Sequence, residues 1–212
     1  MTATLFDFNG VLVDDEHVHL AAFREVLGIP ITDEAYAERY MGFDDAGAFR
    51  AMLRDAGRDS SDAEVARLVL AKKPVYMRLV ANGLVVFEGA RAIVERRAAR
   101  GVVGIVSGAL RDEIEHALGV IGVRDRVRFV VSAEDAPACK PDPQGYLLAK
   151  RMLDGADAVV IEDSLAGVAA AKAAGLRCAA VAHSYPAERL REAGADVVAA
   201  RLADLTDAML DA

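Results

Sequence analysis

The chain has 212 residues, a formal net charge of −8 and 54% apolar residues. This length suits one α/β domain or a core with a small insert, and the apolar content excludes a disordered chain. The acidic charge argues against nucleic acid or an anionic membrane as the main partner, whereas a small anion can still bind a local group of cations.

The sequence carries no signal for export or membrane insertion. The opening MTATLFDFNG lacks the basic and apolar regions of a secretory signal, and no apolar run approaches the length of a membrane span. The two cysteines, Cys139 and Cys178, lack the spacing of a metal site. We therefore expect a cytoplasmic protein without a nucleic-acid or membrane partner, present as a monomer or a weak dimer.

Six short apolar runs predict strands buried on both faces of a sheet, because the runs are unbroken rather than alternating. They are residues 5–8, 102–106, 129–131, 159–161, 178–181 and 196–199. Helical patterns separate the later runs, at 90–100, 110–118, 144–153, 165–174 and 187–192. This alternation predicts an α/β fold with a doubly wound, parallel, Rossmann-like sheet.

The interval between the first two strands is far longer than a crossover needs, at roughly 85 to 95 residues. Helical patterns fill most of it, at 18–27, 33–40, 45–56 and 61–80. Pro74 predicts a kink or a break in the last of these helices. We expect residues 16–82 to form an all-helical cap domain, inserted into a core made of residues 1–15 and 83–212.

Polar residues lie at the carboxyl ends of four predicted strands or follow them in the chain, where open parallel sheets bind ligands. They are, in chain order, Asp7, Ser107, Lys140 and the pair Glu162–Asp163. Each alone has an ordinary structural explanation, such as a turn, a helix cap or a solvated lysine. Four such positions at successive strand ends indicate one shared site.

The acidic members of this set suit phosphoryl chemistry with a metal ion. Asp7, Glu162 and Asp163 offer the hard oxygen ligands that Mg²⁺ prefers. A carboxylate can also attack phosphorus and form an aspartyl-phosphate, which makes Asp7 the candidate nucleophile. Lys140 and the metal would offset the repulsion between that carboxylate and an anionic substrate.

The segment Ser107-Gly108-Ala109 suits the phosphate itself. The Ser107 hydroxyl and the backbone N–H groups near Gly108 and Ala109 would bind phosphoryl oxygens at a helix N-terminus. For Ser107 alone, a role as the N-cap of the following helix is the competing interpretation.

Four segments resemble the motifs of the haloacid dehalogenase superfamily. They are DFNGVL at 7–12, VSG at 106–108, KPDP at 140–143 and IEDSLAG at 161–167. The similarity covers nearly the whole chain, and the fourth motif is the most specific. The predicted insert is similar to the helical C1 cap of the β-phosphoglucomutase-like and phosphoglycolate-phosphatase-like branch.

The resemblance implies a role for each residue of the core site. Asp7 would be the nucleophile. Mg²⁺ would be held by Asp7, the backbone carbonyl of Asn9 and Asp163, with Glu162 in the same ligand network. Lys140 would steady the nucleophile and the phosphate. The implied activity is magnesium-dependent hydrolysis of small phosphate monoesters, with a small phosphorylated metabolite as the partner.

Two residues of the predicted cap also match the family. His19 matches a histidine near the cap hinge in β-phosphoglucomutase-like members, and Lys72 matches a cap lysine that reaches the substrate. We expect His19 to supply a proton, because its unperturbed pKa near 6.5 suits that task. A purely structural place on the first cap helix is the alternative for His19.

Asn9 is the main departure from the family pattern. The family's phosphatases and mutases carry an aspartate there, which protonates the leaving oxygen and then activates water. An amide cannot transfer that proton, and general acid–base catalysis is typically worth about 10² to 10⁴-fold, so turnover should be slow. Three interpretations stay open: a slow hydrolase, a non-catalytic member that binds a phosphorylated metabolite, and an asparagine introduced to trap a complex.

A sugar-phosphate mutase is the alternative enzyme. The mutases place an arginine after the cap glycine to hold a distal phosphate, whereas here Gly42 is followed by Phe43, Asp44 and Asp45. These acids favour the phosphatase. A receiver domain lacks an insert of this size, and a dehalogenase that attacks carbon has no need of the acid pair.

Overall fold

A computed structural model describes residues 2–81 and 83–212. The chain divides into two compact units. Unit 1 runs up to Asp14 and resumes at Val86–Ala212, and unit 2 is Asp15–Val85. Met1, the predicted start of the core, and Asn82, the predicted end of the cap, lie outside the described residues.

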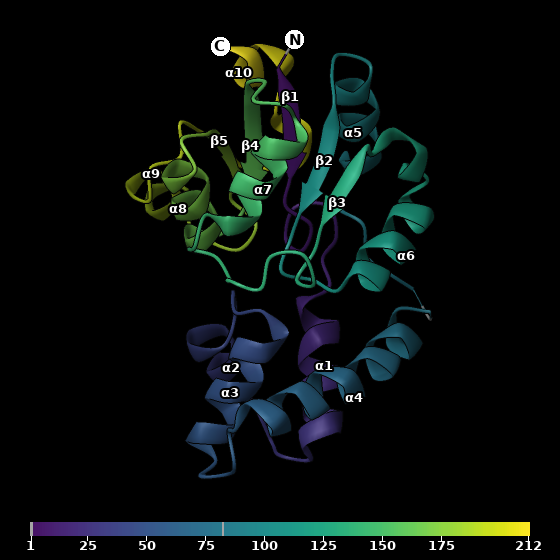
Figure 1. The fold of residues 1–212 in the computed structure, drawn as a ribbon, viewed down its shortest axis with the longest axis vertical. Coiled ribbons are helices and arrows are strands. Elements are labelled where there is room, and N and C mark those ends of the chain that lie inside the picture. Colours follow the sequence, from purple (N-terminus) through teal and green to yellow (C-terminus); the bar gives the residue numbers. More distant parts are fainter. Residues whose placement is uncertain (1, 82) are drawn as a thin grey trace. The chain divides into compact units, whose positions relative to one another are not determined.

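Unit 1 is built on a parallel sheet with the strand order β3-β2-β1-β4-β5-β6 (Figure 1). The strands are β1 (Ala3–Phe6), β2 (Val103–Val106), β3 (Phe129–Val131), β4 (Ala158–Glu162), β5 (Arg177–Val181) and β6 (Val197–Ala199). Leu5 of β1 lies opposite Gly104 on one side and Val160 on the other. The predicted α/β fold with a doubly wound parallel sheet is confirmed.

Helices connect these strands and cover both faces of the sheet. They are α5 (Ala90–Ala98), α6 (Arg111–Ile121), α7 (Gln144–Met152), α8 (Leu165–Ala173), α9 (Ala187–Glu192) and α10 (Asp207–Asp211), with short 3₁₀ turns at Arg124–Arg126 and Leu202–Asp204. Leu5 and other alternate strand residues pack with α7, α8 and α9 in one core cluster. Thr4, one position away, accepts a hydrogen bond from Arg97 of α5.

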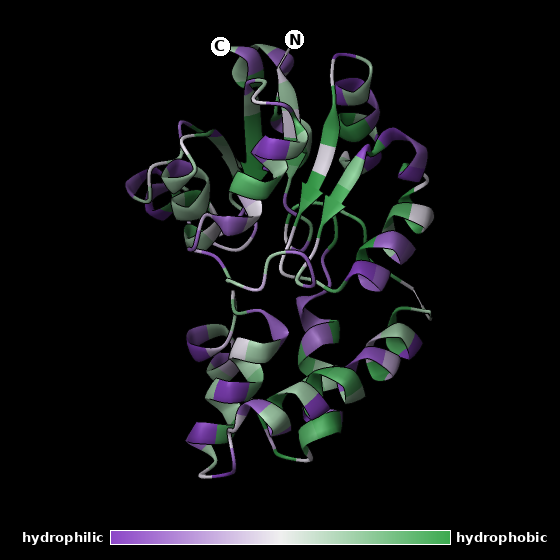
Figure 2. Ribbon diagram, viewed as in Figure 1, coloured by the Kyte–Doolittle hydropathy of each residue, from purple (hydrophilic) through white to green (hydrophobic). Residues whose placement is uncertain are grey.

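The two buried faces explain the unbroken apolar runs of the sequence. All four residues of β1, all four of β2 and all five of β4 are buried. Figure 2 shows β2, β3 and β4 mainly in the hydrophobic colour, whereas the helices alternate between hydrophobic and hydrophilic stripes. A strand covered on both faces needs apolar residues at every position, but a helix needs them on one side only.

Unit 2 consists of helices with their own apolar clusters. The helices are α1 (Glu16–Leu27), α2 (Asp33–Arg39), α3 (Asp45–Asp55) and α4 (Asp62–Val80). Phe23 of α1 meets Phe49 of α3 edge to face, with ring centroids 4.9 Å apart. None of the helices that the structure describes has both the length and the apolar content to cross a membrane.

Pro74 does not split α4, which continues from Asp62 to Val80. Proline removes the N–H that would bond to the carbonyl of Leu70 and is expected to break a helix. Buried side chains on both sides of it, Leu68 and Tyr76, anchor the two halves of α4 in the apolar clusters of unit 2. Tertiary packing therefore overrides the local penalty at this position.

Candidate active site

The candidate site lies at the carboxyl ends of β1 and β4, two neighbouring strands at the centre of the sheet. Asp7 follows β1, Glu162 ends β4 and Asp163 follows it. The strand order reverses at this point, which is where open α/β sheets bind ligands. The three side chains are buried, and each offers one carboxylate oxygen within 4.8 Å of those of the other two.

Lys140 holds two of these acids together. Its Nζ donates to Asp7 Oδ1 at 2.6 Å, to Glu162 Oε1 at 2.6 Å and to the backbone oxygen of Val106 at 3.2 Å. These contacts use all three ammonium protons. Burial lowers the pKa of Lys140, but the adjacent carboxylates outweigh it and hold that pKa above its ordinary value. Lys140 is therefore a fixed positive charge.

Glu162 is fully buried, and both of its oxygens are engaged. Oε1 accepts from Lys140 and from the Tyr146 hydroxyl at 2.8 Å. Oε2 accepts from the backbone N–H groups of Asp163 and Ser164 and from the Ser164 hydroxyl. These contacts fix Glu162, which in turn orients Lys140. The role of Glu162 in a metal ligand network remains a prediction.

The charges of the other two carboxylates, Asp7 and Asp163, are not fully balanced by nearby donors. Burial, with a contribution from Glu162, raises the pKa of Asp7 to about 7 despite the opposing effect of Lys140. Burial and the charges of Glu162 and Asp7 raise the pKa of Asp163 well above its usual value. A divalent cation would relieve this repulsion, and the donors are hard oxygens, so the residues fit Mg²⁺.

Ser107 lies beside this cluster and contacts the motif around Asp7. Its hydroxyl accepts from the backbone N–H of Ala109 at 3.1 Å and donates to Asn9 Oδ1 at 3.4 Å. The N-cap of α6 is Leu110, so the interpretation of Ser107 as a helix cap is wrong. Gly108 is exposed, which leaves its backbone open to a ligand.

Two glycines let the acids sit against the backbone. An added Cβ on Gly10 would lie 2.0 Å from Asp163 Oδ2, and the φ of Gly10 is +75°, a value that side chains rarely tolerate. An added Cβ on Gly167 would lie 1.8 Å from Glu162 Oε1. The close approach of backbone and carboxylate explains why both motif positions require glycine.

The two predicted cap residues lie together within unit 2. Lys72 is fully buried, and its Nζ is 2.7 Å from His19 Nδ1 and 2.5 Å from Asp45 Oδ1. Nδ1 must therefore accept, so Nε2 carries the ring proton, and it lies 3.3 Å from Asp15 Oδ2. The proton-supplying role of His19 and the substrate contact of Lys72 remain predictions.

Sequence reasoning missed three contributors to the core site. The sequence pattern places Tyr146 only within a predicted helix, although its hydroxyl donates to Glu162. His183 and Ser184 follow β5, and they contact Gly10 and Asp163 respectively. The strand-end rule that identified the other residues, applied to β5 as well, would have found this pair.

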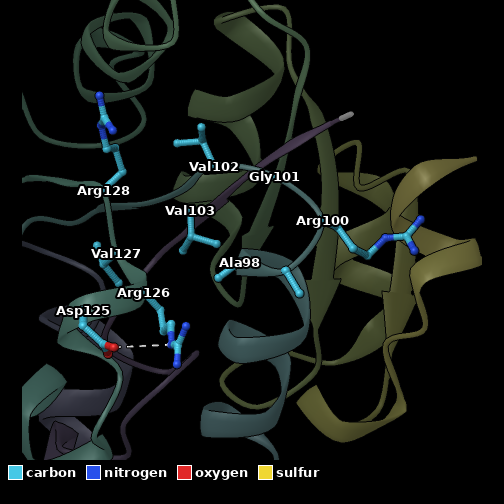
Figure 3. Close-up of a pocket in the computed structure, with 10 residues that line it drawn as sticks. Ala98, Arg100, Gly101, Val102, Val103, Asp125, Arg126, Val127 and Arg128 are labelled. Atoms are coloured by element: carbon cyan, nitrogen blue, oxygen red, sulfur yellow. Dashed lines mark ion pairs between the residues drawn. The ribbon is translucent and has the colours of Figure 1, made fainter.

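A second concave surface lies at the opposite ends of the strands (Figure 3). It is lined by the end of α5, the start of β2 and residues 125–128 before β3. The labelled Arg100, Arg126 and Arg128 point in different directions, and Arg126 pairs with Asp125 at 3.5 Å. Because these charges do not converge, the carboxylate cluster is the candidate site.

Comparisons with known proteins agree with this geometry. The chain is 31% identical over 210 residues to validoxylamine A 7′-phosphate phosphatase of Streptomyces hygroscopicus subsp. limoneus, covering 96% of this chain and 93% of the relative. It is 28% identical over 218 residues to β-phosphoglucomutase of Bacillus subtilis, covering 97% and 92%. An Asp-to-Asn variant of CbbY from Rhodobacter sphaeroides, solved with xylulose-1,5-bisphosphate, has a TM-score of 0.88, 29% identity and full coverage of both chains.

Residues 1–175 match the family model described as haloacid dehalogenase-like hydrolase, a range that contains all four motifs. The predicted resemblance and the phosphatase class are confirmed. The chain belongs to the haloacid dehalogenase-like hydrolase family, in the branch of β-phosphoglucomutase and phosphoglycolate phosphatase.

Proposed function

We propose that the chain hydrolyses small phosphate monoesters with Mg²⁺, through an aspartyl-phosphate on Asp7. The observation that carries the proposal is the contact of 2.6 Å between Lys140 Nζ and Asp7 Oδ1 inside a cluster of buried carboxylates. Asp7, the backbone carbonyl of Asn9 and Asp163 would hold the metal. Its chemistry, when bound, is to offset the negative charge of the carboxylates and of the phosphate.

Asp7 would act as the nucleophile. One of its oxygens is held by Lys140, and the other attacks phosphorus while the bond from phosphorus to the ester oxygen breaks. The electron pair leaves with that oxygen, which takes a proton from solvent. Water then hydrolyses the acyl phosphate, which releases inorganic phosphate and restores the carboxylate.

The segment Ser107-Gly108-Ala109 would bind the phosphoryl oxygens during both steps. The hydroxyl of Ser107 is already oriented by the N–H of Ala109 and points toward Asn9. Donors that are fixed before the reaction stabilise the developing charge without a cost of reorganisation.

Asn9 lowers the expected rate, because its amide cannot donate a proton to the leaving oxygen or accept one from water. The test is a screen of phosphate monoesters with the wild type beside Asn9→Asp. We expect Asn9→Asp to raise kcat by about 10² to 10⁴-fold, with little change in KM. Asp7→Asn should abolish turnover in both backgrounds.

Two controls make this screen decisive. Asn9-Gly10 is prone to deamidation, so peptide mass spectrometry must show that the wild type still carries asparagine. If Asn9→Asp hydrolyses no ester of the panel while both proteins bind Mg²⁺, the hydrolase proposal is wrong. The second candidate, a member that binds a phosphorylated metabolite without turnover, would then stand.

Asn9 itself favours that second candidate, and one comparison supports retained binding. The CbbY variant that holds xylulose-1,5-bisphosphate also has an asparagine in place of an aspartate. A mutase is the alternative enzyme, and the similarity to β-phosphoglucomutase supports it. The mutases hold the distal phosphate with an arginine after the cap glycine. Here the segment after Gly42 contains the acid Asp45, which pairs with Lys72 and would repel a distal phosphate.

We also propose that residues 16–82 act as a cap that selects a small phosphorylated metabolite in the cytoplasm. The buried pair of His19 and Lys72 gives this helical unit a polar centre. If His19 supplies the missing proton, His19→Ala should lower kcat of the wild type at least tenfold. It should have much less effect in the Asn9→Asp background, and an equal loss in both would leave His19 a structural role.

A further inference from the structure

The loop after β5 contacts the candidate metal site at two points. β5 ends at Val181, and the hydroxyl of Ser184 donates to Asp163 Oδ2. His183 Nδ1 lies 2.8 Å from the backbone oxygen of Gly10. A carbonyl oxygen only accepts, so Nδ1 carries the proton and His183 is the donor. Two consecutive residues therefore hold one acid and the turn that follows the nucleophile.

That turn and that acid are in direct contact. The missing side chain of Gly10 leaves the space that Asp163 occupies, because a Cβ there would lie 2.0 Å from Asp163 Oδ2. The N–H of Gly10 bonds to the oxygen of Val13 at 2.9 Å, while its own oxygen accepts from His183. The Asn9–Gly10 peptide, whose carbonyl belongs to Asn9, is thus held by the bond from the Gly10 N–H to Val13, and the next peptide, Gly10–Val11, is held by His183.

The ring of His183 is itself held in place. It stacks on Phe87, with centroids 4.0 Å apart and an angle of 19° between the rings. The N–H of Phe87 donates to the oxygen of Leu12 at 3.1 Å, and Val86 pairs with Val13 in an antiparallel bridge. His183 is therefore oriented by the segments through which the chain leaves unit 1 and returns to it.

We propose that His183 and Ser184 are positioning residues for Mg²⁺ binding: His183 holds the Gly10–Val11 peptide next to the Asn9 carbonyl, and Ser184 orients the carboxylate of Asp163. This inference rests on the proposed function, in which Asn9 and Asp163 supply metal ligands. Among the hydrogen bonds that the structure describes, neither residue bonds to the carboxylate of Asp7, the proposed nucleophile. Their loss should weaken the metal site and leave the chemical step intact, because outer contacts orient the ligands.

The test is calorimetric titration of the metal-free protein with Mg²⁺ alone. Ser184→Ala removes one oxygen, and His183→Leu removes the donor but keeps an apolar group against Phe87. Each should raise the Kd for Mg²⁺ about 10- to 100-fold. Ser184→Thr and His183→Asn retain a donor, and they should stay within about threefold of the wild type. His116→Leu, on α6, is the matched control.

Activity supplies the second measurement. At saturating Mg²⁺, Ser184→Ala and His183→Leu should recover most of the wild-type kcat, which a general loss of folding would not allow. Unchanged Mg²⁺ affinity in both variants would overturn the positioning role while leaving the hydrolase proposal intact. Failure of the wild type to bind Mg²⁺ would overturn both. If His183→Leu does not fold, Ser184→Ala and Ser184→Thr still decide the question.

Discussion

Three buried carboxylates face one ammonium group at the carboxyl ends of β1 and β4. Lys140 and the hydrogen bonds around Glu162 stabilise that carboxylate, and they hold the pKa of Glu162 below its usual value although burial raises it. Asp7 and Asp163 keep raised pKa values. The site is therefore arranged with a surplus of negative charge, which is the condition for binding a divalent cation.

Proton binding should compete with Mg²⁺ at this site. The folded-state pKa of Asp7, about 7, exceeds the unfolded value of about 3.9, so its contribution to stability is present below pH 4 and is lost as pH rises through 7. Asp163 shifts in the same direction. We expect the affinity for Mg²⁺, and the rise in Tm on adding it, to increase from pH 6 to pH 8.

Calorimetry and thermal unfolding at pH 6, 7 and 8, with and without Mg²⁺, measure this effect. Asp7→Asn removes one carboxylate at which protons compete with Mg²⁺, so the affinity for Mg²⁺ should depend less on pH in this variant. An affinity that is the same at pH 6 and pH 8 would show that Asp7 is not a ligand with a raised pKa.

Gly167 and Gly119 offer a matched pair of substitutions in helices. Gly167→Ala would drive a methyl group into the fully buried carboxylate of Glu162 and displace Lys140. We expect a loss of about 1 to 3 kcal/mol in the free energy of unfolding, together with a lower kcat. Gly119 lies inside α6, and a Cβ added there would meet open space. Gly119→Ala should therefore raise the free energy of unfolding by about 0.5 to 1 kcal/mol.

Urea unfolding of the two variants beside the wild type gives both free energies. A Gly167→Ala protein as stable and active as the wild type would mean that Glu162 can move freely.

The last helix, α10, depends on a contact with α5. It has five residues, too few for a stable isolated helix. Arg97 of α5 is almost fully buried, and its guanidinium donates to Asp207 at 3.1 Å and to Asp211 at 2.7 Å. Its Nε also donates to Thr4 of β1, so Arg97 ties α10 to the sheet.

We expect Arg97→Met to lower the free energy of unfolding by about 2 kcal/mol, because the buried Thr4 hydroxyl loses its donor and Asp207 and Asp211 each lose one of their arginine partners. Arg100→Met is the control. Arg100 also bonds to Asp211, but its side chain is 52% exposed, so its loss should cost at most about 1 kcal/mol. Equal effects in urea unfolding would contradict the docking role of Arg97.

The stabilisation that Arg97 provides also depends on pH. The hydrogen bond from Arg97 lowers the pKa of Asp211. Burial raises the pKa of Asp207, but Arg97, Arg96 and Arg100 together outweigh burial and lower it. Stability from a lowered pKa is present above the unfolded value of about 3.9 and is lost as pH falls. The difference between Arg97→Met and the wild type should therefore shrink below about pH 4.

Each unit of the molecule has its own apolar clusters, and all the proposed metal ligands belong to unit 1. The points where the chain leaves and re-enters unit 1 are paired, since Val13 and Val86 form an antiparallel bridge. Residues paired in this way lie about 4.5 to 5.5 Å apart. A short turn can therefore replace the whole of unit 2.

We expect a chain in which residues 15–85 are replaced by a four-residue Gly/Ser turn to fold and to bind Mg²⁺ with an affinity near that of the full chain. If unit 2 acts as the cap, hydrolysis of phosphorylated metabolites should fall sharply. Circular dichroism and calorimetry give the first two results, and the phosphatase assay gives the third. Retained hydrolysis with unchanged KM would remove the cap role from unit 2.

The sequence alone determined the order of strands and helices, the long helical insert and the family, because unbroken apolar runs, periodicity and motif spacing are local properties. It also identified a set of polar residues at strand ends or in the loops that follow them, namely Asp7, Ser107, Lys140, Glu162 and Asp163. Their meeting at neighbouring strands follows from one rule about parallel sheets. The family match confirms that assignment of the fold.

Only the tertiary structure decided how these groups contact one another. Pairing of β4 with both β1 and β5 brings Ser184 to Asp163 and His183 to Gly10, contacts that span 21 and 173 positions in the chain. The continuity of α4 through Pro74, and the engagement of both Glu162 oxygens, likewise depend on packing partners distant in sequence. Local patterns carry no record of such partners, because burial and hydrogen bonding are set by the folded chain as a whole.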